Sequence, residues 1–167
     1  MTDLADSPWW LIGVTVLAAL LLSVLPMPAL LEPYQPDWLA LVVIYWCLTT
    51  PERFGPGTAW CCGIVMDALH GTLLGQHALA LLIIASLALR FRLQVRVFPI
   101  VQQSLTVALL LAVHAFILIW IDGVVGVFIG GVARAWPVLA SALAWPLVVI
   151  GLDWIRERSG NGEHVPG

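Results

Sequence analysis

The sequence has few charged residues and no lysine. Only 10% of its 167 residues are charged, whereas 61% are hydrophobic. Soluble domains are about 45–50% apolar and about 25% charged. A soluble globule of this size could not bury so much apolar surface, and a disordered chain would need the opposite composition. The composition therefore indicates an integral membrane protein whose apolar side chains face lipid.

Other features that the sequence lacks exclude several classes of function. The seven basic residues, all arginine, are outnumbered by ten acidic ones, so the net charge of −3 provides no basic surface for nucleic acid. Three cysteines, of which Cys61 and Cys62 are adjacent, make neither a disulfide framework nor a zinc motif. The sequence has no glycine-rich phosphate loop, no HExxH or GxSxG motif and no plausible Ser-His-Asp set. We therefore expect no enzyme, no catalytic residues, no metal and no cofactor.

Prolines, glycines and charges divide the chain into six apolar stretches. A helix needs about 20 residues to cross about 30 Å of hydrocarbon. The long stretch 57–89 is divided in two, because one straight helix over it would measure about 50 Å and the glycines near its middle offer a turn. The second stretch is short for a span, so we expect it to be tilted, extended by its flanks or shielded by neighbours. The prediction is an all-α polytopic membrane domain with six transmembrane helices, over about residues 9–31, 38–50, 58–74, 77–89, 97–121 and 136–155.

The arginines predict how the spans are oriented. With six spans and both termini in the cytoplasm, six arginines face the cytoplasm and only Arg134 faces outward. With five spans, the seven arginines would divide less clearly, with five on one side of the membrane and two on the other. The inward-facing set includes Arg53, Arg90, Arg92 and Arg96, the last three in a predicted basic loop. Topology already accounts for these residues, and contact with anionic lipid or a cytoplasmic partner is the alternative. The acidic start of the chain lacks the basic region of a signal peptide, so the first span is expected to remain in the mature protein.

Polar and small residues share one face of the third span. At about 100° per residue, Gly63, Asp67, His70 and Gly71 lie on this face, and Gly75 follows at the same four-residue step. Small residues let another backbone approach closely, and an acid inside a membrane should face protein. Asp67 with His70 could bind an ion, relay protons or hold a ligand. Alternatively, Asp67 caps or hydrogen-bonds a neighbouring helix, which makes this face a packing or partner interface. We favour the packing interpretation.

The remaining polar residues of the spans support that preference. Asp122 and Asp153 fall near span ends, so no second buried acid is expected to face Asp67. His114 stands alone in the fifth span, and we interpret it as an interhelical hydrogen-bond donor. His77 lies at the predicted turn, where it can reach water or cap a helix.

Several motifs resemble those of one known family. They are Pro36-Asp37-Trp38, Tyr45-Trp46, Phe54-Gly55, the run from Gly63 to Leu79, and Arg96-Val97-Phe98-Pro99 followed by Gln102-Gln103. Together they resemble the family of the rod shape-determining protein MreD, over about residues 36–121. The pattern G-x-x-x-D-x-x-x-G-x-x-L-G-x-H is the most specific part. The first and last spans match in hydropathy and position only.

The resemblance implies a fold, partners and a role. Members of this family are non-enzymatic subunits of the peptidoglycan elongation machinery in the bacterial inner membrane. The implied role is a scaffold that docks the bitopic protein MreC and links it to the wall synthases, in a complex with the actin-like MreB, the polymerase RodA and a class B transpeptidase. The implied fold resembles the S components of energy-coupling-factor transporters. The alternative function is therefore a membrane subunit that binds a small molecule or a lipid.

Overall fold

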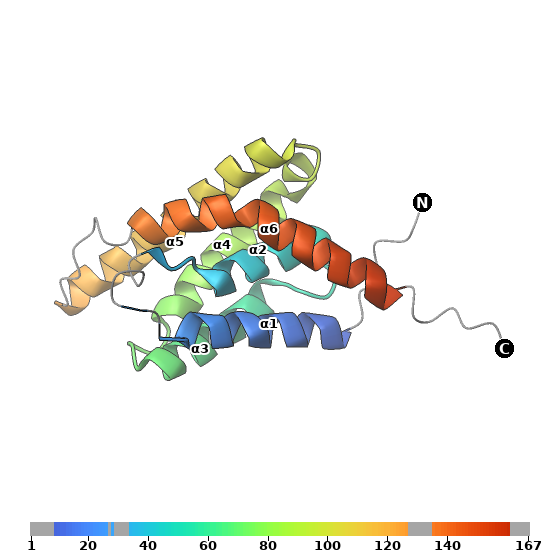
Figure 1. Cartoon of the computed structure of the whole chain (residues 1–167). Coiled ribbons are helices and arrows are strands. Elements are labelled where there is room, and N and C mark those ends of the chain that lie inside the picture. Colours follow the sequence, from blue (N-terminus) through green and yellow to red (C-terminus); the bar gives the residue numbers. More distant parts are fainter. Residues whose placement is uncertain (1–8, 27, 29–33, 127–134, 161–167) are drawn as a thin grey trace.

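The computed structural model describes residues 9–26, 28, 34–126 and 135–160, and within them all regular secondary structure is helical. No strand occurs in these ranges, which confirms the all-α prediction. The helices form one bundle (Figure 1). They are α1 (Trp9–Val24), α2 (Trp38–Thr49), α3 (Pro56–His70), α4 (Gln76–Val95), α5 (Ile100–Val125) and α6 (Ala135–Gly160).

Three helices, α4, α5 and α6, are long and apolar enough to cross a membrane, while α1 and α2 are shorter apolar helices. The outward faces of α5 and α6 carry exposed leucines, such as Leu105, Leu109, Leu143 and Leu147. Continuous apolar faces of this kind would be unfavourable in water and fit a lipid environment. The architecture is that of a polytopic membrane protein, as predicted.

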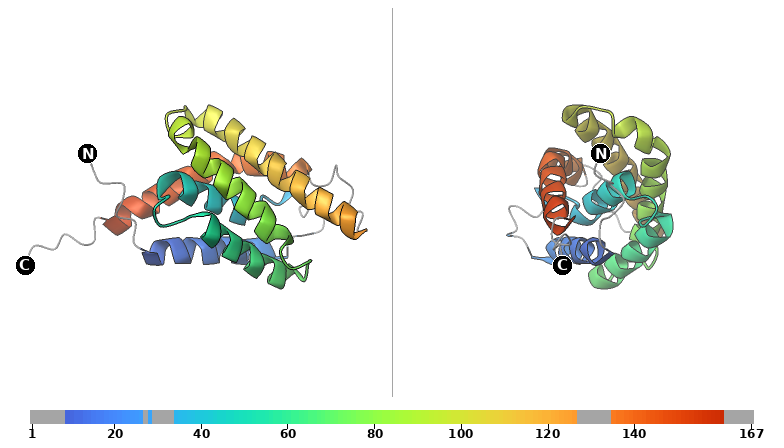
Figure 2. Two further views of the ribbon diagram at one scale, coloured as in Figure 1. Left: turned by 180° about the vertical axis from the view of Figure 1, so that it is seen from behind. Right: turned by 90° about the vertical axis from the view of Figure 1, so that its right-hand side faces the viewer.

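Helix α2 lies at the centre of the bundle, which the end-on view of Figure 2 shows. Every residue from Leu39 to Leu48 is buried, and the helix packs against α1, α4, α5 and α6. Asp37 caps the start of α2, since its side chain accepts a hydrogen bond from the Ala40 N–H at 3.1 Å. A helix of 12 residues can therefore remain within the bundle because protein rather than lipid surrounds it.

Two helices end earlier than the predicted spans. Helix α1 ends at Val24, just before two prolines that cannot continue it, whereas the predicted span reached residue 31; residues 29–31 lie outside the described part of the chain. Helix α3 ends at His70 instead of residue 74, because Gly71 takes a left-handed conformation with φ 63° and its N–H returns to the Asp67 carbonyl. This is a common way for a helix to stop.

Helix α4 is longer than predicted. It continues to Val95, so Arg90 and Arg92 lie in its last turns and Arg96 follows as its C-terminal cap. The predicted basic loop is thus mostly a basic helix end. Cations at this position interact favourably with the unpaired carbonyls and the negative end of the helix dipole, which explains why charges did not interrupt the helix.

The start of α1 and the end of α6 lie at the same end of the bundle in both side views (Figures 1 and 2). The Arg53 guanidinium lies 5.7 Å from the centre of the Trp9 ring, so the α2–α3 connection reaches this end as well. At the end of α6, Arg158 lies 4.1 Å over Trp154. Arg134, the one arginine predicted to face outward, lies outside the described residues.

Candidate functional site

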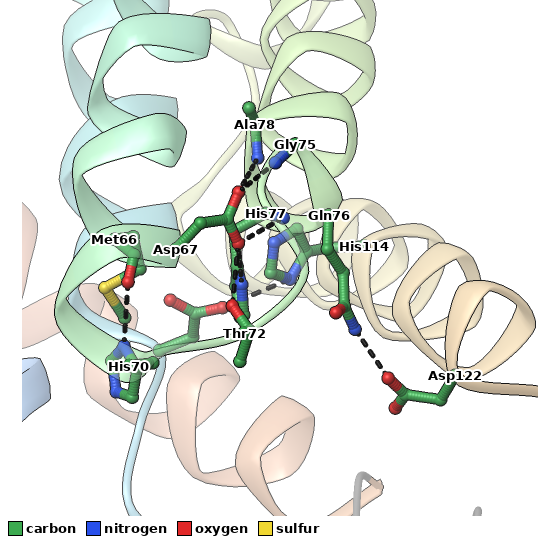
Figure 3. Close-up of polar contacts among 11 residues, drawn as sticks. Met66, Asp67, His70, Thr72, Gly75, Gln76, His77, Ala78, His114 and Asp122 are labelled. Atoms are coloured by element: carbon green, nitrogen blue, oxygen red, sulfur yellow. Dashed lines mark hydrogen bonds and ion pairs between the residues drawn. The ribbon is translucent and has the colours of Figure 1, made fainter. Parts of the chain in front are cut away.

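Asp67 is fully buried and accepts five hydrogen bonds (Figure 3). Its Oδ1 accepts from Thr72 Oγ1 at 2.9 Å, from the His77 N–H at 3.0 Å and from His77 Nδ1 at 2.8 Å. Its Oδ2 accepts from the Gly75 N–H at 2.8 Å and, more weakly, from the Ala78 N–H at 3.4 Å. The carboxylate therefore uses both oxygens on groups of its own chain.

These bonds cap the start of α4. The first N–H groups of a helix have no partner inside it, and within a membrane no water replaces that partner. Asp67 supplies the partner from the preceding helix, because the turn after Gly71 brings α4 back alongside α3. Gly75, with φ 103°, makes the second left-handed step of this turn. The two glycines thus belong to the α3–α4 turn rather than to a helical face that continues from Gly63.

Gly63 lies where α3 and α4 come closest. A Cβ atom on this residue would be 2.3 Å from the Ala78 Cα and 2.5 Å from the Ala78 N, closer than real atoms approach. The small residue is therefore required by packing within the chain. Gly63 and Asp67 face α4, so this part of the predicted interface is occupied internally; the contacts favour the packing interpretation of Asp67.

The partner of Asp67 is His77 and not His70. His70 is exposed, and its Nδ1 lies 3.2 Å from the Met66 carbonyl within α3. The rings of the two histidines stack with their centres 6.0 Å apart. Helical periodicity places His70 one turn after Asp67, but the reversal of the chain at Gly71 places a residue ten positions later closer to the carboxylate. One sequence pattern could have indicated this cap: an acidic residue followed by a glycine-containing turn and then by a second helix.

A second carboxylate–imidazole pair links helices far apart in the sequence. Asp37 Oδ2 lies 3.1 Å from His114 Nδ1, where α2 begins beside the middle of α5. The Asp37 N–H also donates to Ser141 Oγ of α6 at 2.8 Å. Asp37 was noted in the sequence only as part of a motif, and His114 only as a solitary donor. Together with Ser141, this pair links α2, α5 and α6. No local pattern in the sequence predicts the contact.

Three members of the two pairs, Asp37, His77 and His114, line a cavity of about 240 Å³. The rings of His77 and His114 have their centres 6.3 Å apart. His114 is only 3% exposed, and its Nε2 has no hydrogen-bond partner among the described residues. The lining comes from α1, the α1–α2 connection and α3 to α6, and includes Ser23, Gln35, Asp37, Met66, His77, His114 and Ser141. The site can hold a polar group in an otherwise apolar bundle.

Two other acids, Asp122 and Asp153, act in helix contacts outside this cavity. Asp122, near the end of α5, accepts a hydrogen bond from Gln76 Nε2 at 2.6 Å, at the start of α4. Asp153 of α6 accepts one from the Tyr45 hydroxyl of α2. Among the described residues, no group of three or more histidines, cysteines and acids is placed to hold a metal ion.

Exchanging the two stacked histidines for phenylalanine should separate their roles. We expect His77→Phe to lower the free energy of unfolding by about 1–3 kcal/mol, because a buried carboxylate loses a donor. His70→Phe should change it by less than about 0.5 kcal/mol, because the side chain is exposed. Thermal unfolding of the purified protein in detergent measures both. Equal losses in the two variants would contradict the assignment of His77 as the partner.

Comparison with known proteins gives one family and one relative to which the chain is similar. The family model described as rod shape-determining protein MreD matches residues 7–153. The chain is also similar to the "Rod shape-determining protein MreD" of Haemophilus influenzae, with 28% identity over 162 residues that cover 90% of this chain and 93% of the relative. No solved structure matches the chain.

Proposed function

The chain belongs to the MreD family of rod shape-determining proteins, and on that basis we propose that it is a non-enzymatic membrane scaffold of the wall elongation machinery. The match to the family model over most of the chain carries this proposal. In this role the protein docks MreC directly and holds it near MreB, RodA and a class B transpeptidase. The helical bundle lies in the bacterial inner membrane, with both termini in the cytoplasm.

The structure favours outward helix faces as the docking surface. Gly63 and Asp67 pack against α4 of the same chain, so they offer no free face to a partner helix. By contrast, α1, α3, α5 and α6 all present exposed apolar side chains. A single membrane-spanning helix of MreC can pack on such a face without unpacking the bundle, and van der Waals packing drives this kind of association in lipid.

A photocrosslinking scan in cells tests the docking proposal. A photoreactive amino acid replaces one exposed residue on each outward face: Leu17, Val65, Leu109 or Leu147. We expect crosslinks to MreC from one face and none from the others, because one helix can cover only one face. The buried Leu111, at 2% exposure, serves as the matched position that no partner can reach.

The scan is scored only in variants that keep cells rod-shaped. Under that condition the protein is folded and active at every position compared. Absence of MreC crosslinks from all four exposed positions would contradict direct docking on these faces. Equal crosslinking from all of them would indicate random encounter in the membrane and would contradict it as well.

One observation favours the alternative of a ligand-binding membrane subunit. His114, which lines the cavity, has a buried imidazole nitrogen that finds no partner among the described residues. Buried polar groups in folded proteins are nearly always paired, and exceptions are often explained by a bound molecule. A scaffold role and a ligand in this cavity are compatible with one another.

A further inference from the structure

We propose that the cavity between the Asp67–His77 and Asp37–His114 pairs binds a protonated primary amine. The proposal is independent of the docking of MreC. It follows from three properties of the cavity: the kind of hydrogen-bonding atoms that are free, the sign of the charge beside them, and the size of the space.

The free polar atoms are acceptors. An ionised carboxylate can only accept hydrogen bonds, so each histidine donates its Nδ1–H to its aspartate. A neutral imidazole has one donor and one acceptor nitrogen. In the neutral state of the two rings, the Nε2 atoms of His77 and His114 are therefore acceptors, and that of His114 is buried without a partner among the described residues. A ligand that fits must bring N–H or O–H donors.

The charge beside these atoms is negative. Asp37 lines the cavity and its side chain is 26% exposed, whereas the lining residues in the described part of the chain include neither arginine nor lysine. The charge of Asp67 is surrounded by five donors of the α3–α4 turn and the start of α4. Among the described residues, the Asp37 side chain has only the Ala40 N–H and His114 as partners. A positive ligand would meet an incompletely compensated carboxylate in a medium of low dielectric constant, where such attraction is strong.

The size of the cavity limits the ligand. Pockets for drug-sized molecules measure about 300–1,000 Å³, so about 240 Å³ suits a small molecule or a lipid head group. A primary ammonium has three N–H donors on one positive charge. One of these N–H groups can donate to His114 Nε2, while the positive charge is attracted by the Asp37 carboxylate beside the same ring. The amine can belong to a soluble molecule or to the ethanolamine head group of a membrane lipid.

Ethanolamine and choline form a matched pair of probes for this site. They carry the same charge, but the quaternary nitrogen of choline has no N–H to donate. In a titration of the full-length protein in detergent, followed by the nitrogen NMR signals of its histidines, we expect ethanolamine to shift Nε2 of His114. Choline should bind at least tenfold more weakly. His114→Phe should abolish the saturable ethanolamine response of the remaining histidines, while His70→Phe, outside the cavity, should preserve it.

Native mass spectrometry then distinguishes the two sources of the amine. Protein from mixed phosphatidylethanolamine and phosphatidylcholine nanodiscs should retain the former if the ligand is a lipid, and neither lipid if it is a soluble amine that ethanolamine mimics. Equal binding of ethanolamine and choline would overturn the proposal. So would the absence of binding by both ethanolamine and phosphatidylethanolamine, or a response of His114 to acetate in their place. The comparison of ethanolamine with choline uses the unmodified protein, so its outcome does not depend on whether any variant folds.

Discussion

Replacing Gly63 with alanine is expected to lower the free energy of unfolding by about 3 kcal/mol, a large effect for one methyl group. The added Cβ would lie 2.3 Å from the Ala78 Cα, and the nearest atoms belong to backbone that cannot rotate away. Helices α3 and α4 would have to separate, and overpacking of this kind costs about 1–3 kcal/mol or more. Thermal or denaturant unfolding in detergent measures the loss.

Gly13→Ala is the matched control for this variant. Gly13 lies on the exposed face of α1, and a Cβ there would meet no atom within 4 Å. Alanine favours helix more than glycine does, so this variant should be neutral or slightly more stable. If Gly63→Ala unfolded at the same temperature as Gly13→Ala, the close approach of α3 and α4 would be refuted.

The second large effect is expected at Asp67. Asp67→Leu should lower the free energy of unfolding by about 3–5 kcal/mol, because it leaves buried donors of the α4 start and His77 without an acceptor. Asp67→Asn should cost less, about 2–3 kcal/mol, since one oxygen remains. The same unfolding measurement applies, with Glu52→Gln as the control that removes an exposed acid.

A double-mutant cycle tests the mechanism behind that loss. If Asp67 acts through His77, the effects of Asp67→Asn and His77→Phe should be non-additive, with a coupling of about 0.5–3 kcal/mol. The pair Asp67→Asn and His70→Phe should be additive within about 0.5 kcal/mol. Coupling to His70 and none to His77 would reverse the assignment made from the structure.

These stability effects bear on how partner binding should be assayed. A variant at Gly63 or Asp67 that fails to co-purify MreC and rounds the cells would be explained by loss of the α3–α4 packing. Such variants cannot locate a docking face. Substitutions on exposed positions, which leave the bundle intact, are the informative ones for the scaffold role.

Local patterns in the sequence determined much of the fold. Apolar stretches interrupted by prolines and glycines predicted six helices, because burial in lipid and helix breaking both act within a few residues. The family motif from Gly63 to His77 identified the part of the chain where polar residues enter the bundle. The boundaries were less accurate at the basic end of α4, where Arg90 and Arg92 extend the helix instead of ending it.

Tertiary structure alone decided what the polar residues do. Asp67 and His70 share a helical face by periodicity, yet the turn at Gly71 pairs the acid with His77 and turns a predicted interface into the cap of α4. Asp37 and His114 meet only because α2 is enclosed by the other helices. The sequence alone determined the membrane environment and the positions of these groups, since both depend on composition and spacing. Which groups meet, and which nitrogen remains free in the cavity, depends on how distant helices pack.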